Sequence, residues 1–325
     1  TNNIKIYSRS DENVLIEKNM IAIENKNTLF AYGNSAFEMY EKAPGNIHIS
    51  YPLSNGVIAD IKNMETLIQY FIGDLQKGIA KPADFYIAVP TDVTEVEKRA
   101  FYDLIKDAGV KARKIMVVEK AVADGLGLDI DVKNSQGVMV VNVGYETTEI
   151  SILSLGGIVL SRLIKTGGLK FDEAIRTAVR KKFSLVIGGK TSETVKIQLK
   201  DLEAEGRGAV VYGRDIVTGL PVEREIPTKL VDETLEEHFN SIIDNVKVIL
   251  ERTPPELAAD IYRHGIYLTG GASQVSHLAE RLAMGTGLRV NVSENPSISV
   301  VMGLAKIIKD ENYRSVAYAI EGMSK

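Results

Sequence analysis

The sequence predicts a protein of the α/β class with about two domains. A strand–turn–helix unit at 85–109 and a second sheet-forming run at 138–164 are the first two observations. A further strand–turn–helix pattern begins at 266. The run at 138–164, as a second such unit inside an otherwise α/β chain, favours a duplicated architecture. The chain has 325 residues, which allows about two domains at roughly 100–200 residues each.

The first half begins with short strands and continues with amphipathic helices. Three strands are expected at 4–7, 13–16 and 20–24. At 63–75 the apolar residues recur at three- and four-residue steps, which is typical of one buried helix face. A strand at 85–89 then leads to Thr94 and Glu97, whose spacing predicts a capping box for a helix that ends at Gly109.

The second half contains a β-meander and a long helix. Three extended segments are expected at 138–143, 147–154 and 158–164. A helix at 170–182 precedes a polar, glycine-rich stretch at about 185–225, which is consistent with an inserted subdomain. The apolar pattern at 230–250 predicts a long amphipathic helix, and a strand follows at 266–268.

The composition excludes several kinds of chemistry. Because cysteine is absent, the chain has no disulfide framework, thiolate zinc site, iron–sulfur cluster or thiol nucleophile. Its 39 basic and 43 acidic residues are interspersed and its pI is about 5.8, which gives no electrostatic footprint for nucleic acid. No apolar run approaches the roughly 20 residues of a membrane-spanning helix. The histidines lack metal-ligand spacing and are interpreted as structural or exposed; they are His48, His238, His264 and His277.

Glycine-rich turns are the candidates for ligand binding. They are Gly144-Tyr145-Glu146, Thr166-Gly167-Gly168 and Gly270-Gly271. The last lies between a strand and a helix expected from about Gln274, where free backbone N–H groups suit a phosphate. A tight connection without any ligand is the alternative for each turn. The chain has no Walker A or GxGxxG pattern, so the P-loop and Rossmann interpretations lose their main support.

Seven segments, spread over the chain in the same order, carry a resemblance to a known family. They are YPLSNGVIAD (51–60), AVPTDVTEVEKRAF (88–101), SLGGIV (154–159), GRDIVTGLP (213–221), ERTPPELAADI (251–261), YLTGGAS (267–273) and VVMGLAKII (300–308). In these segments the chain resembles the MreB family, the bacterial actins that organise rod shape. Long co-linear matches of this kind are specific.

The resemblance implies the actin-like fold that heat-shock chaperone ATPases and sugar kinases share. Two α/β domains then face each other across a nucleotide cleft, and each carries a small subdomain. Domain I would comprise 1–136 and 306–325, with its small subdomain at about 17–58. Domain II would comprise 137–305, with an inserted small subdomain at about 182–228.

The resemblance also implies which residues contact the nucleotide. The GYETT turn lies where the family has its second phosphate loop, D-I-G-G-G-T-T, and Thr1-Asn2-Asn3-Ile4 matches the tail of the first, D-L-G-T-A-N-T. The implied nucleotide-binding residues are Thr1, Asn2, Asn3, Asn142, Gly144, Tyr145, Glu146, Thr147, Gly167, Gly168, Glu193, Lys196, Gly270, Gly271 and Ala272. Glu119 matches the glutamate that positions the attacking water. No direct metal ligand is implied, and Mg²⁺ is expected near Asn142 through water.

The second loop departs from the family pattern at three positions. Asn142 replaces an aspartate, which removes a charge that would hold hydrated Mg²⁺. Tyr145 and Glu146 replace glycines, so we expect bulk, costly positive φ and repulsion of the phosphates. Losing one preorganised electrostatic contact costs ~10²–10³ in rate. We therefore expect reduced affinity for nucleotide and Mg²⁺ and weak or lost hydrolysis; an intact member with an unusual loop is the alternative.

The function implied is that of a cytoskeletal protein. It would bind ATP or ADP and assemble head to tail into single or paired filaments for cell shape, with itself, other MreB paralogues or morphogenesis proteins as partners. One alternative is a non-polymerising scaffold that binds other filament subunits. A kinase-like enzyme is another, but we see no catalytic carboxylate separate from the nucleotide loops. Nucleic acid is not an expected partner.

The resemblance implies a cytoplasmic location, with the inner face of the cell membrane as a second site. Some family members insert a short apolar loop into the membrane, and others use an N-terminal amphipathic helix. The corresponding loop here, LQKGIAKPAD, has only Ile79 and Ala80 as apolar residues near its tip. At ~0.8 kcal/mol per buried CH₂ this is too little for firm insertion. These residues therefore do not support membrane association.

Overall fold

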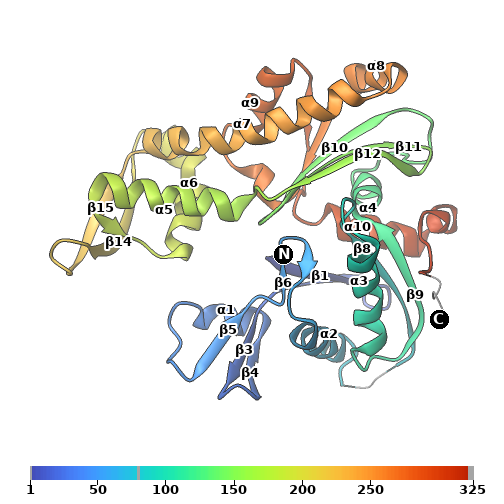
Figure 1. The fold of residues 1–325 in the computed structure, drawn as a ribbon, viewed down its shortest axis with the longest axis horizontal. Helices are drawn as coiled ribbons and strands as arrows, with labels where there is room; N and C mark the ends of the chain where they lie inside the picture. Colours follow the sequence, from blue (N-terminus) through green and yellow to red (C-terminus); the bar gives the residue numbers. More distant parts are fainter. Residues whose placement is uncertain (1, 79–80, 321–325) are drawn as a thin grey trace.

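The computed structural model describes residues 2–78 and 81–320. They form two lobes, with β1–β9 and α1–α3 in one and β10–β17 with α5–α9 in the other (Figure 1). Thr1, Ile79 and Ala80, on which the sequence analysis placed expectations, lie outside the described residues.

The first lobe is built from small sheets flanked by helices. Its strands are β1 (Asn3–Ser8), β2 (Asn13–Lys18), β3 (Ile21–Glu24), β4 (Thr28–Tyr32), β5 (Ile47–Ser50), β6 (Leu53–Ser54), β7 (Val57–Ile58), β8 (Ala83–Val89) and β9 (Ala112–Glu119). Its helices are α1 (Gly33–Met39), α2 (Ile61–Leu75) and α3 (Glu95–Asp107). β8 and β9 pair in parallel, whereas β1–β2, β4–β3–β5 and β6–β7 are antiparallel.

The second lobe contains a mixed five-stranded sheet and a small antiparallel sheet. Its strands are β10 (Val138–Val143), β11 (Thr148–Ser154), β12 (Gly157–Ile164), β13 (Leu185–Val186), β14 (Ala209–Asp215), β15 (Pro221–Ile226), β16 (Ile266–Thr269) and β17 (Val290–Val292). Its helices are α5 (Gly168–Phe183), α6 (Gly189–Glu205), α7 (Thr228–Arg252), α8 (Pro255–His264), the 3-10 turn η1 (Gly271–Gln274) and α9 (Leu278–Thr286). The larger sheet has the order β12–β11–β10–β16–β17, and β10 runs parallel to β16.

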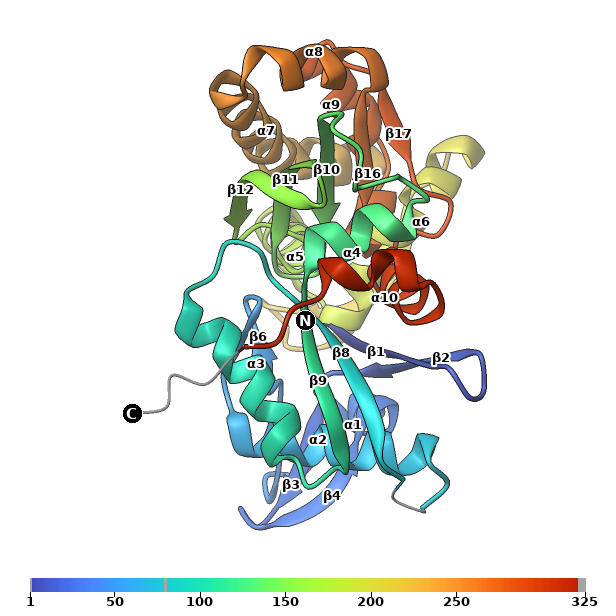
Figure 2. The same cartoon turned by 90° about the vertical axis from the view of Figure 1, so that its right-hand side faces the viewer.

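Two helices join the lobes. α4 (Lys120–Gly127) and α10 (Ser299–Lys309) pack against each other between the five-stranded sheet and β8–β9 (Figure 2). α4 contacts β9 and β10, while α10 contacts β1 and β8. A 3-10 turn, η2 (Glu311–Val316), follows α10. Because these helices contact strands of both lobes, a movement of one lobe against the other would change their packing.

The apolar patterns of the sequence account for the core. β10 is buried along its whole length, as its apolar run, interrupted by Asn142, predicts for a central strand. The buried face of α7 consists of Val231, Leu235, Phe239, Ile242, Ile243, Val246 and Ile249. The capping box of α3 is confirmed, since Thr94 Oγ1 accepts from the Glu97 N–H at 3.2 Å and Glu97 Oε2 accepts from the Thr94 N–H at 2.7 Å.

The helix expected from about Gln274 is present as α9, but its predicted start is wrong, because the helix begins at Leu278. The chain instead forms the 3-10 turn η1, in which Ser273 Oγ donates to the Gly270 carbonyl at 2.7 Å. Val275 is extended and His277 has a φ of 69°, so α9 begins only at Leu278. Across residues 2–78 and 81–320, no helix combines the length and apolar character that crossing a bilayer requires.

Candidate functional site

The three glycine-rich turns of the second lobe meet at one place. The first follows β10, the second opens α5 and the third follows β16. β10 and β16 are parallel neighbours, so their carboxyl ends lie at the same edge of the sheet. The first turn is closed by the Gly144 N–H, which donates to the Thr147 carbonyl at 2.8 Å.

Two of the glycines are required for this convergence. A Cβ atom at Gly167 would lie 2.5 Å from the carbonyl oxygen of Gly144. Gly270 has a φ of 89°, and a Cβ atom there would overlap the carbonyl oxygen of Val143. Any larger residue would push the turns apart.

The turns border a cavity of about 1,180 Å³ that is lined from both lobes. The predicted nucleotide-binding residues that line it are Asn2, Asn3, Asn142, Gly144, Tyr145, Gly168, Glu193, Lys196, Gly270, Gly271 and Ala272. Four other predicted residues do not line the cavity. Gly167 and Thr147 contact Gly144 within the turns, and Glu119 and Glu146 bond to partners described below. The structure thus brings together residues that are far apart in the sequence.

Asn142 faces a carboxylate that sequence reasoning missed. Its Nδ2 donates to Asp124 Oδ2 at 2.5 Å, and Thr269 Oγ1 contacts Asp124 Oδ1 at 3.4 Å. Asp124 is fully buried, and this burial raises the pKa of its carboxyl while the hydrogen bond from Asn142 opposes the rise. The only signal in the sequence is one aspartate within the apolar helix α4.

These surroundings do not suit a hydrated Mg²⁺ at Asn142. Both oxygens of Asp124 already accept hydrogen bonds, and Glu149 is paired with Lys120 at 2.5 Å. The described residues contain no group of three or more histidine, aspartate or glutamate side chains that could hold a metal. Hydrated Mg²⁺ is held through carboxylate oxygens, and the two carboxylates nearest Asn142 are already committed to other partners.

Tyr145 fits its turn without the strain expected of it. Neither Tyr145 nor Glu146 has a positive φ, so the expectation of costly backbone geometry is wrong. The Gly168 and Leu169 N–H groups donate to the carbonyls of Gly144 and Tyr145 at 3.0 and 2.6 Å. The start of α5 is therefore bonded to the turn rather than free for an anion. The Tyr145 ring lies beside Gly168 in the cavity, and burial raises the pKa of its phenol.

Glu146 reaches across to the other lobe. Its Oε1 accepts from Ser54 Oγ at 3.1 Å and its Oε2 accepts from the Asn55 N–H at 2.7 Å. We expected this carboxylate to repel the phosphates of a ligand. Its side chain does not line the cavity, so the geometry does not support that expectation. It connects the lobes instead.

A second contact between the lobes lies in their outer parts. Lys190 Nζ donates to the Phe37 carbonyl at 2.7 Å and lies 4.2 Å from the centre of the Phe37 ring. The Gly189 N–H donates to Glu41 Oε2 at 3.2 Å. Together with the Glu146 contact, these bonds link the lobes at two places.

Glu119, the predicted catalytic residue, lies at the end of β9. Its Oε1 accepts from Lys98 Nζ at 2.9 Å and from the Tyr318 hydroxyl at 2.8 Å. The side chain does not line the cavity. Its Oε2 is buried and has no hydrogen-bond partner among the described residues, so only one oxygen of the carboxylate is engaged.

Three lysines line the cavity near the turns, and sequence reasoning identified only one of them. Lys196 pairs with Asp172 at 2.7 Å; burial raises the pKa of Asp172 to about 6, and Lys196 opposes the rise. Lys120 pairs with Glu149. Lys5 donates to the backbone oxygen of Ser297 in the other lobe. The sequence of β1 alternates, so from the sequence alone Lys5 cannot be distinguished from a lysine that faces solvent.

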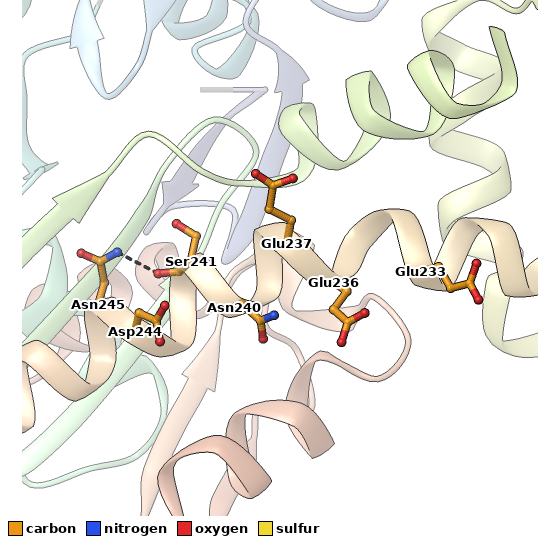
Figure 3. Close-up of a pocket in the computed structure, with 7 residues that line it drawn as sticks. All are labelled: Glu233, Glu236, Glu237, Asn240, Ser241, Asp244 and Asn245. Carbon is orange, nitrogen blue, oxygen red and sulfur yellow. Dashed lines mark hydrogen bonds between the residues drawn. The ribbon is translucent and has the colours of Figure 1, made fainter. Parts of the chain in front are cut away.

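A second hollow lies on the exposed face of α7. It is lined by Glu233, Glu236, Glu237, Asn240, Ser241, Asp244 and Asn245. The side chains project from successive turns of one helix, and the marked bond is between Asn245 Nδ2 and the Ser241 carbonyl at 2.7 Å (Figure 3). This is the hydrophilic side of an amphipathic helix and offers no ligand an enclosing wall.

The comparisons with known proteins agree on one family. The family model described as "MreB/Mbl protein" matches residues 1–315. The cell shape-determining protein Mbl of Bacillus subtilis is 36% identical over 307 residues, covering 93% of this chain and 92% of Mbl. The cell shape-determining protein MreB of Escherichia coli is 34% identical over 318 residues, covering 95% and 91%.

Solved structures show the same fold. MreB5 of Spiroplasma citri bound to ADP superimposes with a TM-score of 0.88 at 32% identity, covering 97% of this chain and 95% of MreB5. The AMPPNP-bound form of MreB5 gives the same TM-score at 33% identity. A MamK double helical filament gives a TM-score of 0.75 at 20% identity over 93% of this chain and 94% of MamK, which bears on the fold alone. The predicted actin-like fold is confirmed.

Proposed function

The chain belongs to the MreB/Mbl family, and on that premise we propose that it is a cytoskeletal protein that binds ATP or ADP between its lobes. Subunits stack head to tail into filaments that serve cell shape, since a heterologous contact propagates without closing. The two lobes act as the two domains, and α4 and α10 connect them. Other filament subunits of the family are the natural partners, and the cytoplasm is the expected location.

One observation carries this proposal. Three turns converge on a cavity that is lined from both lobes, and their glycines are required for the convergence. The structurally similar MreB5 binds ADP and AMPPNP, and MreB5 is related to this chain over nearly its full length. A ligand that contacts both lobes favours the closed arrangement through its differential affinity.

Hydrolysis is proposed to be weak or lost. Asn142 is bonded to Asp124 rather than free, and it carries no charge with which to hold hydrated Mg²⁺. Glu119 is engaged by Lys98 and Tyr318. Both features reduce the preorganised electrostatics on which the chemical step depends. Affinity for Mg²⁺ is expected to be low for the same reason.

Two measurements on the purified chain test the proposal. Calorimetric titration with ADP and with ATP measures binding, and sedimentation with and without nucleotide measures assembly. We expect binding together with nucleotide-responsive pelleting. Binding without pelleting under any condition would favour the non-polymerising scaffold instead. Absence of nucleotide binding would contradict the assignment of the cavity.

A further inference from the structure

Lys5 is a feature of the cavity that the proposed function leaves unexplained. Its ammonium extends from β1 to the backbone oxygen of Ser297, and it forms no ion pair with any residue among 2–78 and 81–320. Burial, followed by the charge of Lys120, lowers the pKa of Lys5 to about 8, while Asp124 opposes the shift. Burying a cation without a counter-ion is costly, so an anion beside it would stabilise the protein.

No neighbouring carboxylate among the described residues forms an ion pair with Lys5, although the charge of Asp124 acts on it. Lys120 Nζ lies 2.5 Å from Glu149 Oε1, and only 4% of Glu149 is exposed. The oxygens of Asp124 accept from Asn142 and Thr269. Within the described part of the chain, Lys5 is therefore the cavity cation near the turns that is available to a ligand.

The same surroundings are unfavourable for a divalent cation. The nearest carboxylates are already bonded, and an incoming metal would meet the unpaired ammonium of Lys5, whose charge has the same sign. An ammonium and a hydrated Mg²⁺ serve the same purpose beside a phosphate, since each offsets its negative charge and donates hydrogen bonds to its oxygens. An ammonium built into the cavity can therefore take over this role of the metal.

We propose that Lys5 supplies the positive charge beside the phosphates of a nucleoside diphosphate, so that the nucleotide binds without a divalent cation. The inference rests on the proposed function, because it takes the ligand of the cavity to be a nucleotide. It goes beyond that function because it assigns the positive charge beside the phosphates to a residue of the chain and not to a bound metal ion.

The test is a calorimetric titration of the full chain with ADP, once with Mg²⁺ and once with excess EDTA. The affinity of the unaltered chain should be the same in the two buffers to within about threefold, because no metal contact is lost. This arm needs no variant and so cannot fail through misfolding.

Three variants identify the charge that is responsible. Lys5→Met should weaken ADP binding about 10- to 100-fold in EDTA, which is the loss expected for one charge-assisted hydrogen bond. Lys5→Arg should retain most of the affinity because the charge is kept. Lys106→Met, which neutralises an exposed lysine on α3, is the matched control and should bind as the unaltered chain does.

The outcomes separate the inference from the proposed function. Equal binding in both buffers, lost in Lys5→Met and kept in Lys5→Arg, supports the inference. Binding that requires Mg²⁺, or that survives Lys5→Met unchanged, overturns the inference and leaves nucleotide binding intact. Binding in neither buffer overturns the proposed function itself. Far-UV circular dichroism of each variant confirms that it is folded.

Discussion

Removing the Glu146 carboxylate should open the lobes in the absence of nucleotide. In Glu146→Ala both hydrogen bonds, to Ser54 Oγ and the Asn55 N–H, are lost. A hydrogen bond to a charged group contributes about 1.5–3 kcal/mol, and the lower figure applies here because Glu146 is partly exposed. Two such bonds amount to about 3 kcal/mol, or roughly a hundredfold change in the ratio of closed to open molecules.

The assay uses the absence of cysteine from the chain. Spin labels at Lys42→Cys and Lys200→Cys, both exposed and on opposite lobes, report the lobe separation by double electron–electron resonance. The parent should give one short distance with or without ADP, whereas Glu146→Ala should add a longer distance that ADP suppresses. Glu236→Ala, an exposed glutamate on α7, is the control. Identical distance distributions for Glu146→Ala and its parent would refute the reasoning.

Three further predictions concern the turns and the cavity. Gly270→Ala should lower the free energy of unfolding by more than about 1 kcal/mol, because the methyl group meets the end of β10. Gly219 also has a positive φ, of 75°, but open space around it, so Gly219→Ala should cost only about 1 kcal/mol. Thermal unfolding compares the two variants, and equal losses would contradict the packing argument. In single-turnover phosphate release the chain should be slow and a Tyr145→Gly/Glu146→Gly double variant faster; robust hydrolysis by the unaltered chain would contradict the proposed loss. ADP affinity should be highest below pH 8 and fall as pH rises through about 8, since Lys5 is charged only below its lowered pKa. Lys5→Arg should abolish this pH dependence, because arginine stays charged. An affinity of the unaltered chain that does not change with pH would argue against Lys5 as the phosphate contact.

Local features of the fold followed from the sequence because they depend on near neighbours. The capping box of Thr94 and Glu97 and the apolar face of α7 are set by spacings of three and four residues. The start of α9 was missed because it depends on the left-handed backbone of His277, which no residue pattern marks. The meeting of the three turns was expected only through the family resemblance.

The contacts that sequence reasoning missed all join distant parts of the chain. Lys5 and Ser297 are 292 positions apart, and Glu146 is 91 positions from Asn55. The alternation of β1 places Lys5 on one face of a strand without indicating what lies opposite. Asp124 likewise appears as one polar residue in an apolar helix, and only the fold supplies Asn142 as its partner.

The most direct test of the account is an electron cryo-microscopy structure of the purified chain assembled in the presence of ADP. We predict subunits stacked head to tail, with the nucleotide in the cavity and its phosphates bordered by the turns at Gly144, Gly168 and Gly270. Nucleotide density outside these turns, or dispersed single molecules with the nucleotide bound, would contradict it.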